Sequence, residues 1–363
     1  MTKKILIIGS TGKLGAKLLN FVSKNSISIH GITCYKNYKK LSNLKKKYSV
    51  KNDFVLSNKE DSKKFYNYLK QNIDIIYFLD YGSISLQYLN HFLKFNKNSI
   101  VAIANKEMII AGGSLLQNKI KSTNNKFIPL DSEHFSLLNS KFNKENINKI
   151  LITASGGPFY FNKNLNLSNV SSSKVLSHPK WKMGVNNLID SSNFVNKILE
   201  MYELSYIFSI PLNKINFLIS KEAYVHSIIH FTDGTLSINC FHNDMLITLI
   251  KPLISFYNIK HMNINQNYLN LDKLNIELPR DERFKILKYQ NKLMKLSHSE
   301  QIQLMIINNS AHKLYLSNKL KYNDIVEYIM NEIKKNSMNI NLNSFNDILD
   351  FISLQNKYYE TNV

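Results

Sequence analysis

The feature that most constrains the fold is a glycine-rich turn near the start of the chain. Residues 3–8 (KKILII) form an apolar run typical of a buried strand, and helical periodicity extends to about residue 24. Between them stands Gly9-x-x-Gly12-x-x-Gly15. Glycines here permit a tight turn and the helix N-terminus attracts a pyrophosphate, so this context favours a dinucleotide-binding fold. An ordinary strand-to-helix turn stays open as an alternative, because the spacing differs from the commoner G-x-G-x-x-G.

Apolar runs and helix-period segments alternate after this turn, which predicts a doubly wound parallel sheet. The helix-period segments are 61–71 and 85–95. The strand-like runs are residues 27–33, 54–56, 74–80, 99–105, 127–130 and 149–153.

The rest of the chain is predicted to be less uniform. Residues 191–209 have a helical pattern, and residues 225–240 alternate around a turn at Thr232-Asp233-Gly234-Thr235, which indicates a hairpin. A chain of 363 residues exceeds what one core usually serves. The predicted class is α/β, with an N-terminal Rossmann-like parallel sheet, a central α/β catalytic domain and a C-terminal helical domain. The predicted divisions are a cofactor domain at 1–130, a catalytic, metal-binding and dimer-forming domain at 131–257, a linker at 258–285 and a helical domain at 286–363.

Composition excludes several classes of function. The net charge of +21 would suit an acidic partner, but only Arg280 and Arg283 are arginines, and lysine, asparagine and isoleucine are abundant everywhere. This pattern indicates compositional drift, so we expect no nucleic-acid partner. Cys34 and Cys240 are too few for a disulfide framework. No apolar run reaches about 18 residues and the chain opens as a strand, so we expect no membrane span, no leader and a cytoplasmic location.

The second predicted strand ends near Lys36. An NAD site would prefer an acid at this position to bind the ribose hydroxyls, whereas a lysine suits the 2′-phosphate of NADPH. Lys36 is also one of many lysines, so an ordinary surface role stays open.

Three carboxylates are candidates for a metal site. Asp131 and Glu133 follow a strand and begin a helix, at the edge where open α/β sheets bind ligands. Taken alone, this pair is better interpreted as a helix N-cap with a first-turn acid. Glu200 and Asn196 share one helix face, and if that face meets the other two acids, three hard oxygens suit Mg²⁺ or Mn²⁺.

A phosphate site is predicted from a second glycine-rich turn, TASGGPF at residues 153–159, which would expose backbone N–H groups to an anion. Polar groups that suit phosphate oxygens follow it at His178, Ser191, Asn196 and Lys197. Trp181 is the single tryptophan. It is interpreted either as part of a loop that closes over a substrate or as a buried core residue.

Together these stretches resemble the 1-deoxy-D-xylulose-5-phosphate reductoisomerase family of the non-mevalonate isoprenoid pathway. The resemblance covers residues 1–250, in the family's order. The matching words are GSTGKLG (9–15), IANKE (103–107), LDSEH (130–134), TASGGPF (153–159), HPKWKMG (178–184), DSSNFVNKILE (190–200) and VHSIIHFTDGT (225–235).

The resemblance implies an oxidoreductase that rearranges 1-deoxy-D-xylulose 5-phosphate and reduces the product with NADPH to 2-C-methyl-D-erythritol 4-phosphate. It implies a homodimer and a divalent ion, Mg²⁺ or Mn²⁺ with Co²⁺ as a third option. The implied metal ligands are Asp131, Glu133 and Glu200, which with Lys106 form the catalytic set. The residues implied to bind substrate are Lys106, Ser132, Glu133, Ser155, His178, Trp181, Ser191, Asn196, Lys197 and Glu200. Those implied to bind the cofactor are Gly9, Ser10, Thr11, Gly12, Leu14, Gly15, Lys36, Asn37, Asn105, Glu107 and Gly184.

The sequence also departs from the family pattern. Ser220-Lys-Glu-Ala223 stands where the family has His-Pro-Gln-Ser, which removes an imidazole, and Asn308-Asn309 replaces Asn-Glu. Smaller departures are Asn243 in place of a proline and a shortened turn at Tyr81-Gly82-Ser83. We expect activity that is weaker than usual. The alternatives are another NADPH-dependent reductase, for which neither cysteine is a suitable nucleophile, and a binding protein without turnover.

Overall fold

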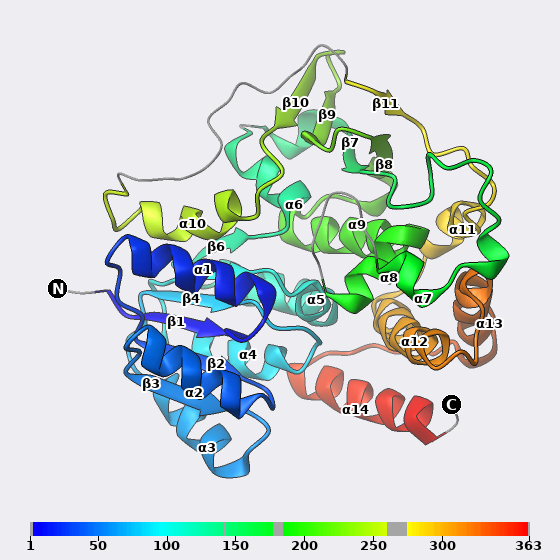
Figure 1. Cartoon of the computed structure of the whole chain (residues 1–363). Helices are drawn as coiled ribbons and strands as arrows, with labels where there is room; N and C mark the ends of the chain where they lie inside the picture. Colours follow the sequence, from blue (N-terminus) through cyan, green and yellow to red (C-terminus); the bar gives the residue numbers. More distant parts are fainter. Residues whose placement is uncertain (1–2, 141, 177–183, 260–273, 362–363) are drawn as a thin grey trace. The chain divides into compact units, whose positions relative to one another are not determined.

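The computed structural model separates the chain into two compact units (Figure 1). The first unit is residues 1–138 with 244–267, and the second is residues 139–243 with 268–363. The structure describes residues 3–140, 142–176, 184–259 and 274–361. The segment after residue 243 therefore groups with the N-terminal sheet, although more than a hundred positions separate them. The four-part domain division stays a prediction.

The first unit is built on a parallel sheet with strand order β3-β2-β1-β4-β5-β6, which is the order of a dinucleotide-binding fold. Its strands are short and mostly buried. The sheet confirms the predicted α/β class with an N-terminal Rossmann-like parallel sheet. The strands are β1 (Ile5–Ile8), β2 (Gly31–Cys34), β3 (Asn52–Val55), β4 (Ile75–Phe78), β5 (Ile100–Ile103) and β6 (Lys126–Pro129).

Helices connect these strands, and α1 lies beside α10 (Figure 1). The Tyr77 hydroxyl on β4 donates to the carbonyl of Leu249 on α10 at 2.9 Å, which ties the late segment to the sheet. The helices of this unit are α1 (Lys13–Lys24), α2 (Tyr38–Lys47), α3 (Lys59–Tyr68), α4 (Ser85–Phe95), α5 (Lys106–Lys121), α6 (Ser132–Ser136) and α10 (Leu246–Ile254).

The second unit contains a mixed sheet with strand order β10-β9-β7-β8-β11. The predicted hairpin is confirmed by the antiparallel pairing of β9 with β10. β11 lies within the predicted linker and pairs with β8, so this part of that stretch is not irregular. The strands are β7 (Ile147–Ala154), β8 (Ile215–Ser220), β9 (Val225–Phe231), β10 (Leu236–Cys240) and β11 (Ile276–Glu277).

Helices of the second unit include the predicted C-terminal group, in which α12 contacts α13 and α14 (Figure 1). The predicted continuous helix at 191–209 is instead two helices, because Phe194 adopts a left-handed conformation with φ of 66°. The helices are α7 (Ser172–Val175), α8 (Val185–Asn193), α9 (Val195–Phe208), α11 (Ile286–Leu293), α12 (His298–Leu316), α13 (Ile325–Asn336) and α14 (Phe345–Thr361). Short 3₁₀ turns are η1 (Leu137–Asn139), η2 (Lys144–Asn146), η3 (Leu167–Asn169), η4 (Leu212–Lys214) and η5 (Tyr322–Asp324).

No helix among the described residues combines the length and the apolar character that a bilayer crossing requires.

The carboxyl ends of β1 and β4 meet at Gly9. The backbone at Gly9 has φ of 78°, and a Cβ there would lie 2.6 Å from the Asp80 nitrogen. Asp80 accepts hydrogen bonds from the Ser85 hydroxyl and from Asn105 Nδ2. Loss of hydration raises the pKa of Asp80 from 3.8 to about 6, although these hydrogen bonds oppose the shift. This acid lies beside the glycine-rich turn, and sequence analysis did not single it out.

We predict that Gly9→Ala destabilises the first unit more than Gly82→Ala does. Both positions have positive φ, 78° and 91°, so alanine costs about 1–2 kcal/mol at either one. At Gly82 a Cβ meets nothing within 4 Å, whereas at Gly9 it meets strand backbone, which adds about 1–3 kcal/mol. Urea unfolding of the two variants checks this difference, and equal losses in the free energy of unfolding would contradict it.

We predict that Asp80 gives stability a pH dependence in the mildly acidic range. The folded protein holds this proton up to about pH 6 and the unfolded chain releases it near pH 3.8, so the free energy of unfolding falls as pH rises through this window. Asp80→Asn removes this contribution. The unfolding free energy of the variant minus that of wild type should therefore increase as pH rises through this window. Asp347→Asn is the control, because the pKa of the Asp347 carboxyl is lowered by hydrogen bonds from Ser344 and the backbone. Parallel wild-type and Asp80→Asn curves would refute the prediction.

Candidate active site

The glycine-rich turn has the geometry expected of a phosphate-binding loop. Gly12 is the N-cap of α1, and a Cβ at Gly15 would lie 2.5 Å from the Ser10 carbonyl oxygen. Ser10 is fully buried, and its hydroxyl donates to the Thr33 carbonyl at 2.9 Å, so it ties β1 to β2. Thr11 and Leu14 are partly exposed at the same turn. The N-terminus of α1 thus begins at this turn, and binding of a pyrophosphate there stays a prediction.

The end of β2 places two further predicted cofactor residues at the surface. Lys36 is exposed, with its Nζ 5.5 Å from the centre of the Tyr35 ring. The Asn37 side chain caps α2 by accepting from the Lys40 backbone N–H at 3.1 Å. Asn37 therefore has a structural role, while the Lys36 ammonium is placed to meet an anion. Their assignment to the cofactor stays a prediction.

Asn105 and Glu107 lie where β5 leads into α5. Asn105 is buried, caps α5 by accepting from the Met108 N–H at 3.0 Å and donates to the Gly82 carbonyl at 2.9 Å. Glu107 is buried in the first turn of the same helix. This junction holds the ends of β4 and β5 in register, next to Asp80.

Two predicted metal ligands lie at the N-terminus of α6. Asp131 is the N-cap and accepts from the Glu133 N–H at 3.2 Å, so the N-cap interpretation is confirmed for this residue. A cap and a metal ligand are compatible roles, because a carboxylate has two oxygens and several acceptor positions. The Ser132 hydroxyl donates to Glu133 Oε2. Lys106 Nζ lies 3.7 Å from Asp131 Oδ2 and balances part of the local negative charge.

Ser155 and Ser191 are brought together in the second unit by a glycine. The turn after β7 has positive φ at Gly156 and Gly157, and the Gly157 N–H donates to the Ser155 hydroxyl at 3.4 Å. A Cβ at Gly157 would lie 2.9 Å from the Ser191 carbonyl oxygen. The turn therefore packs its backbone directly against α8, so both serines belong to one place in the fold.

The start of α9 forms a buried polar cluster of Asn196, Lys197 and Glu200. Lys197 Nζ donates to Glu200 Oε2 at 2.6 Å, and Asn196 Nδ2 donates to Glu200 Oε1. Only 1% of Glu200 is exposed, and these two donors help to stabilise its buried charge. The cluster follows directly after the left-handed joint at Phe194.

His178 and Trp181 lie outside the described residues. Gly184 is the exposed N-cap of α8, and a Cβ at this position would meet nothing within 4 Å. Asp131 and Glu133 belong to the first unit and Glu200 to the second, so their joint binding of one ion stays a prediction.

A buried polar group behind Ser191 was not found by sequence reasoning. Asp190 accepts from His312 Nε2 at 2.8 Å and from Asn308 Nδ2 at 2.9 Å, and all three residues are at most 3% exposed. These contacts connect α8 to α12 across more than a hundred positions, so no local pattern signals them. Their effect is to fix the helix that carries Ser191.

Comparisons with known proteins agree with this architecture. Three family models match, described as 1-deoxy-D-xylulose 5-phosphate reductoisomerase (residues 5–86), its C-terminal domain (127–208) and the DXP reductoisomerase C-terminal domain (244–357). Relatives named 1-deoxy-D-xylulose 5-phosphate reductoisomerase include one from Pelagibacter ubique, 31% identical over 97% of this chain and 98% of the relative. Another, from a Sulfurihydrogenibium species, is 32% identical over 96% of this chain and 95% of the relative.

Solved structures support the fold. The reductoisomerase from Zymomonas mobilis in complex with NADPH superposes with a TM-score of 0.83 at 21% identity, over 99% of each chain. A DOX-P reductoisomerase in complex with NADPH, fosmidomycin and magnesium gives the same TM-score and identity, over 99% of this chain and 98% of that one. Because relatives above 30% identity match along almost the whole length, this chain belongs to the 1-deoxy-D-xylulose 5-phosphate reductoisomerase family.

Proposed function

We propose that this protein converts 1-deoxy-D-xylulose 5-phosphate to 2-C-methyl-D-erythritol 4-phosphate, with NADPH as reductant and a divalent metal ion as cofactor. The observation that carries the proposal is the near full-length relationship to proteins of that name. The geometry adds a dinucleotide-type turn in one unit and a cluster of phosphate-compatible groups in the other. The product would serve isoprenoid precursor synthesis.

NADPH fits the first unit. The turn from Gly9 to Gly15 would accept the pyrophosphate at the N-terminus of α1, and NADPH would supply the hydride for the reduction step. Exposed Lys36 would pair with the 2′-phosphate. Asn105 and Glu107, at the start of α5, are proposed to contact the same cofactor.

The phosphate of the substrate would bind in the second unit. Ser155 and Ser191 offer hydroxyls, Asn196 an amide and Lys197 a cation, which are the donors that a phosphate monoester requires. These groups lie on the glycine turn, on α8 and at the start of α9, which are fixed elements. Binding remote from the reacting carbons orients the substrate and contributes to catalysis. His178 and Trp181 are proposed to complete this site.

A divalent ion fits the donor set of Asp131, Glu133 and Glu200. All three are hard oxygen donors, and Mg²⁺ and Mn²⁺ prefer such ligands to thiols. When bound, the ion would act as a Lewis acid toward the substrate's oxygens. Lys106 and Ser132, beside the two acids of α6, are proposed to bind and orient the oxygenated carbons of the substrate.

A homodimer is proposed through the edge strand β10. β10 ends the order of the second sheet, and its Leu236 and Ile238 are 56% and 51% exposed. An edge strand with exposed apolar side chains invites pairing with another chain.

Two thiols, Cys34 and Cys240, suit a reducing compartment, and the cytoplasm is the proposed location.

We predict that the purified protein oxidises NADPH only when sugar phosphate and Mg²⁺ or Mn²⁺ are both present, and that a chelator abolishes the reaction. Glu200→Gln should lower kcat/KM by more than about a hundredfold, because a lost ligand costs more than a lost supporting contact. Glu327→Gln on α13, which accepts from the Tyr289 hydroxyl, is the control and should retain wild-type turnover. Absence of NADPH oxidation by folded, metal-loaded protein would refute the proposed function.

We predict that Leu236→Asp combined with Ile238→Asp converts the protein to a monomer. Charges on an edge strand oppose pairing, and neither side chain contributes to a buried core here. Sedimentation of both proteins checks the change in mass. A wild-type monomer, or a variant that remains dimeric, would contradict the proposed interface.

A further inference from the structure

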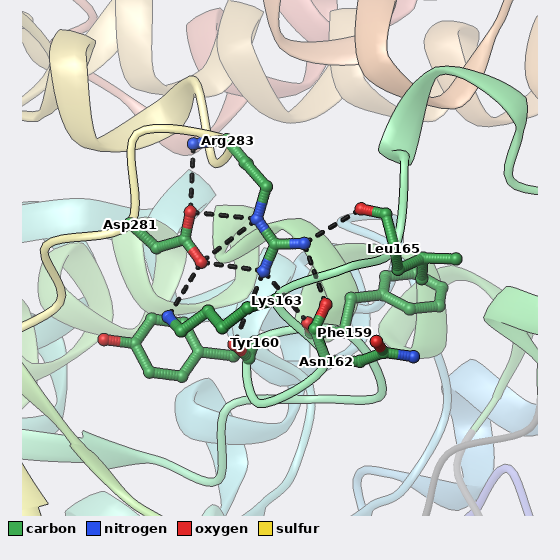
Figure 2. Close-up of polar contacts among 7 residues, drawn as sticks. All are labelled: Phe159, Tyr160, Asn162, Lys163, Leu165, Asp281 and Arg283. Atoms are coloured by element: carbon green, nitrogen blue, oxygen red, sulfur yellow. Dashed lines mark hydrogen bonds and ion pairs between the residues drawn. The ribbon is translucent and has the colours of Figure 1, made fainter.

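Arg283 uses the two terminal nitrogens of its guanidinium group to bond the carbonyls of one loop (Figure 2). Nη1 donates to the carbonyls of Asn162 and Leu165, both at 2.9 Å. Nη2 donates at longer range to the carbonyls of Phe159 and Tyr160, at 3.4 and 3.5 Å. The loop at residues 159–165 therefore closes around a single side chain that is 118 or more positions away in the sequence.

Asp281 fixes the orientation of this guanidinium. Its carboxylate accepts from Arg283 Nε at 3.0 Å and from Nη2 at 2.8 Å, and it also accepts from the Arg283 backbone N–H at 3.1 Å. Lys163 Nζ, on the loop itself, donates to the same carboxylate at 2.9 Å (Figure 2). The Arg283 hydrogen bonds lower the pKa of Asp281, which keeps the carboxylate ionised at neutral pH.

The loop at residues 159–165 continues directly from the glycine turn of the proposed phosphate site. Ser155 and Gly157 precede Phe159 by two to four residues, and Phe159 is 2% exposed. The backbone of Gly157 packs so closely against α8 that a Cβ there would lie 2.9 Å from the Ser191 carbonyl oxygen. A displacement of the loop would therefore move the Ser155 hydroxyl relative to Ser191.

The residue after Arg283 reaches the other half of the same site. The Phe284 ring lies 4.7 Å from that of Phe194 and 5.8 Å from that of Tyr160, measured between centroids. Phe194 is the left-handed residue two positions before Asn196 and three before Lys197. The Arg283–Phe284 pair thus contacts both the loop that follows Ser155 and the joint that begins α9.

We propose that Arg283, oriented by Asp281, is a positioning residue that sets the affinity of the site for the substrate's phosphate group. This inference rests on the proposed function and deepens it. The chemistry requires arginine, because a planar group with five donors can bond a carboxylate and several carbonyls at once, whereas a lysine has three donors on one nitrogen. Arg283 is one of only two arginines in a chain rich in lysine.

The test compares Arg283→Lys with Arg280→Lys in the full-length, metal-loaded protein. Arg280→Lys makes the same chemical change three positions away, at a residue that meets the Tyr160 hydroxyl through its backbone N–H, which the substitution keeps. For each protein we would measure kcat, KM for the sugar phosphate, KM for NADPH, the inhibition constant of inorganic phosphate and the melting temperature. Arg283→Lys should raise the KM for sugar phosphate and the phosphate inhibition constant together by about tenfold to a hundredfold, since small misplacements of binding groups cost this much. KM for NADPH should stay within about twofold of wild type, because the cofactor site is not involved.

A structural role alone would lower the melting temperature and the amount of active protein without moving these two constants. The proposal is overturned if the Arg283→Lys protein folds and retains the wild-type KM for the sugar phosphate and the wild-type inhibition constant of phosphate. Where Arg283→Lys does not fold, Asp281→Asn takes its place, because it loosens the guanidinium but touches no loop carbonyl. It should raise the same two constants severalfold, and wild-type values there also overturn the proposal.

Failure of the proposed function is distinguishable from failure of this inference. If the wild-type protein does not turn over the sugar phosphate, the proposed function fails, and the variants are then compared by thermal protection with inorganic phosphate. Protection of wild type and Arg280→Lys, but not of Arg283→Lys, supports the positioning role of Arg283. Equal protection of all three refutes it.

Discussion

Close approach of one backbone segment to another is the constraint on which both units depend. At Gly9 the turn after β1 lies against the backbone of Asp80, and at Gly157 the turn after β7 lies against Ser191. Each contact occurs at the carboxyl end of a strand, where a sheet presents its ligand-binding edge. A side chain at either glycine would separate the two segments and with them the groups that they position. The glycines thus determine where functional groups can stand, without contributing chemistry themselves.

Buried charge is the second principle that organises the site. Asp190 is stabilised by His312 and Asn308, and Glu200 by Lys197 and Asn196. Such groups stabilise a fold less than apolar residues of similar size would, because desolvation offsets much of their attraction. Their placement around α8 and α9 is therefore better understood as fixing the orientation of those helices.

The sequence predicts the first sheet well, because β1, β2, β4 and β5 are fully buried runs between turns and the glycine motif marks the end of the first of them. It does not predict α2, because this lysine-rich helix buries only Leu41 and so has no clear apolar periodicity. It also predicts one helix where Phe194 creates two, because a left-handed aromatic residue has no local signal. Contacts across long separations, such as Tyr77 with Leu249 or Asp190 with His312, depend on tertiary packing alone. Arg283 was noted only for its rarity, and its role becomes visible once the loop carbonyls are placed around it.

The departure at Ser220–Ala223 has a local structural account. Ala223 adopts φ of 57° and its N–H donates to the Ser220 carbonyl at 3.0 Å, which closes a tight turn between β8 and β9. Glu222 accepts from the backbone N–H of Asn275 at 3.1 Å and from its Nδ2 at 3.0 Å, just before β11. Burial alone would raise the pKa of Glu222, but these hydrogen bonds lower it, so the acid stays ionised in this contact. In this chain the segment ties β11 to the sheet, and β11 leads within a few residues to Asp281 and Arg283. Residues 220–223 therefore support the strand that leads to Asp281 and Arg283.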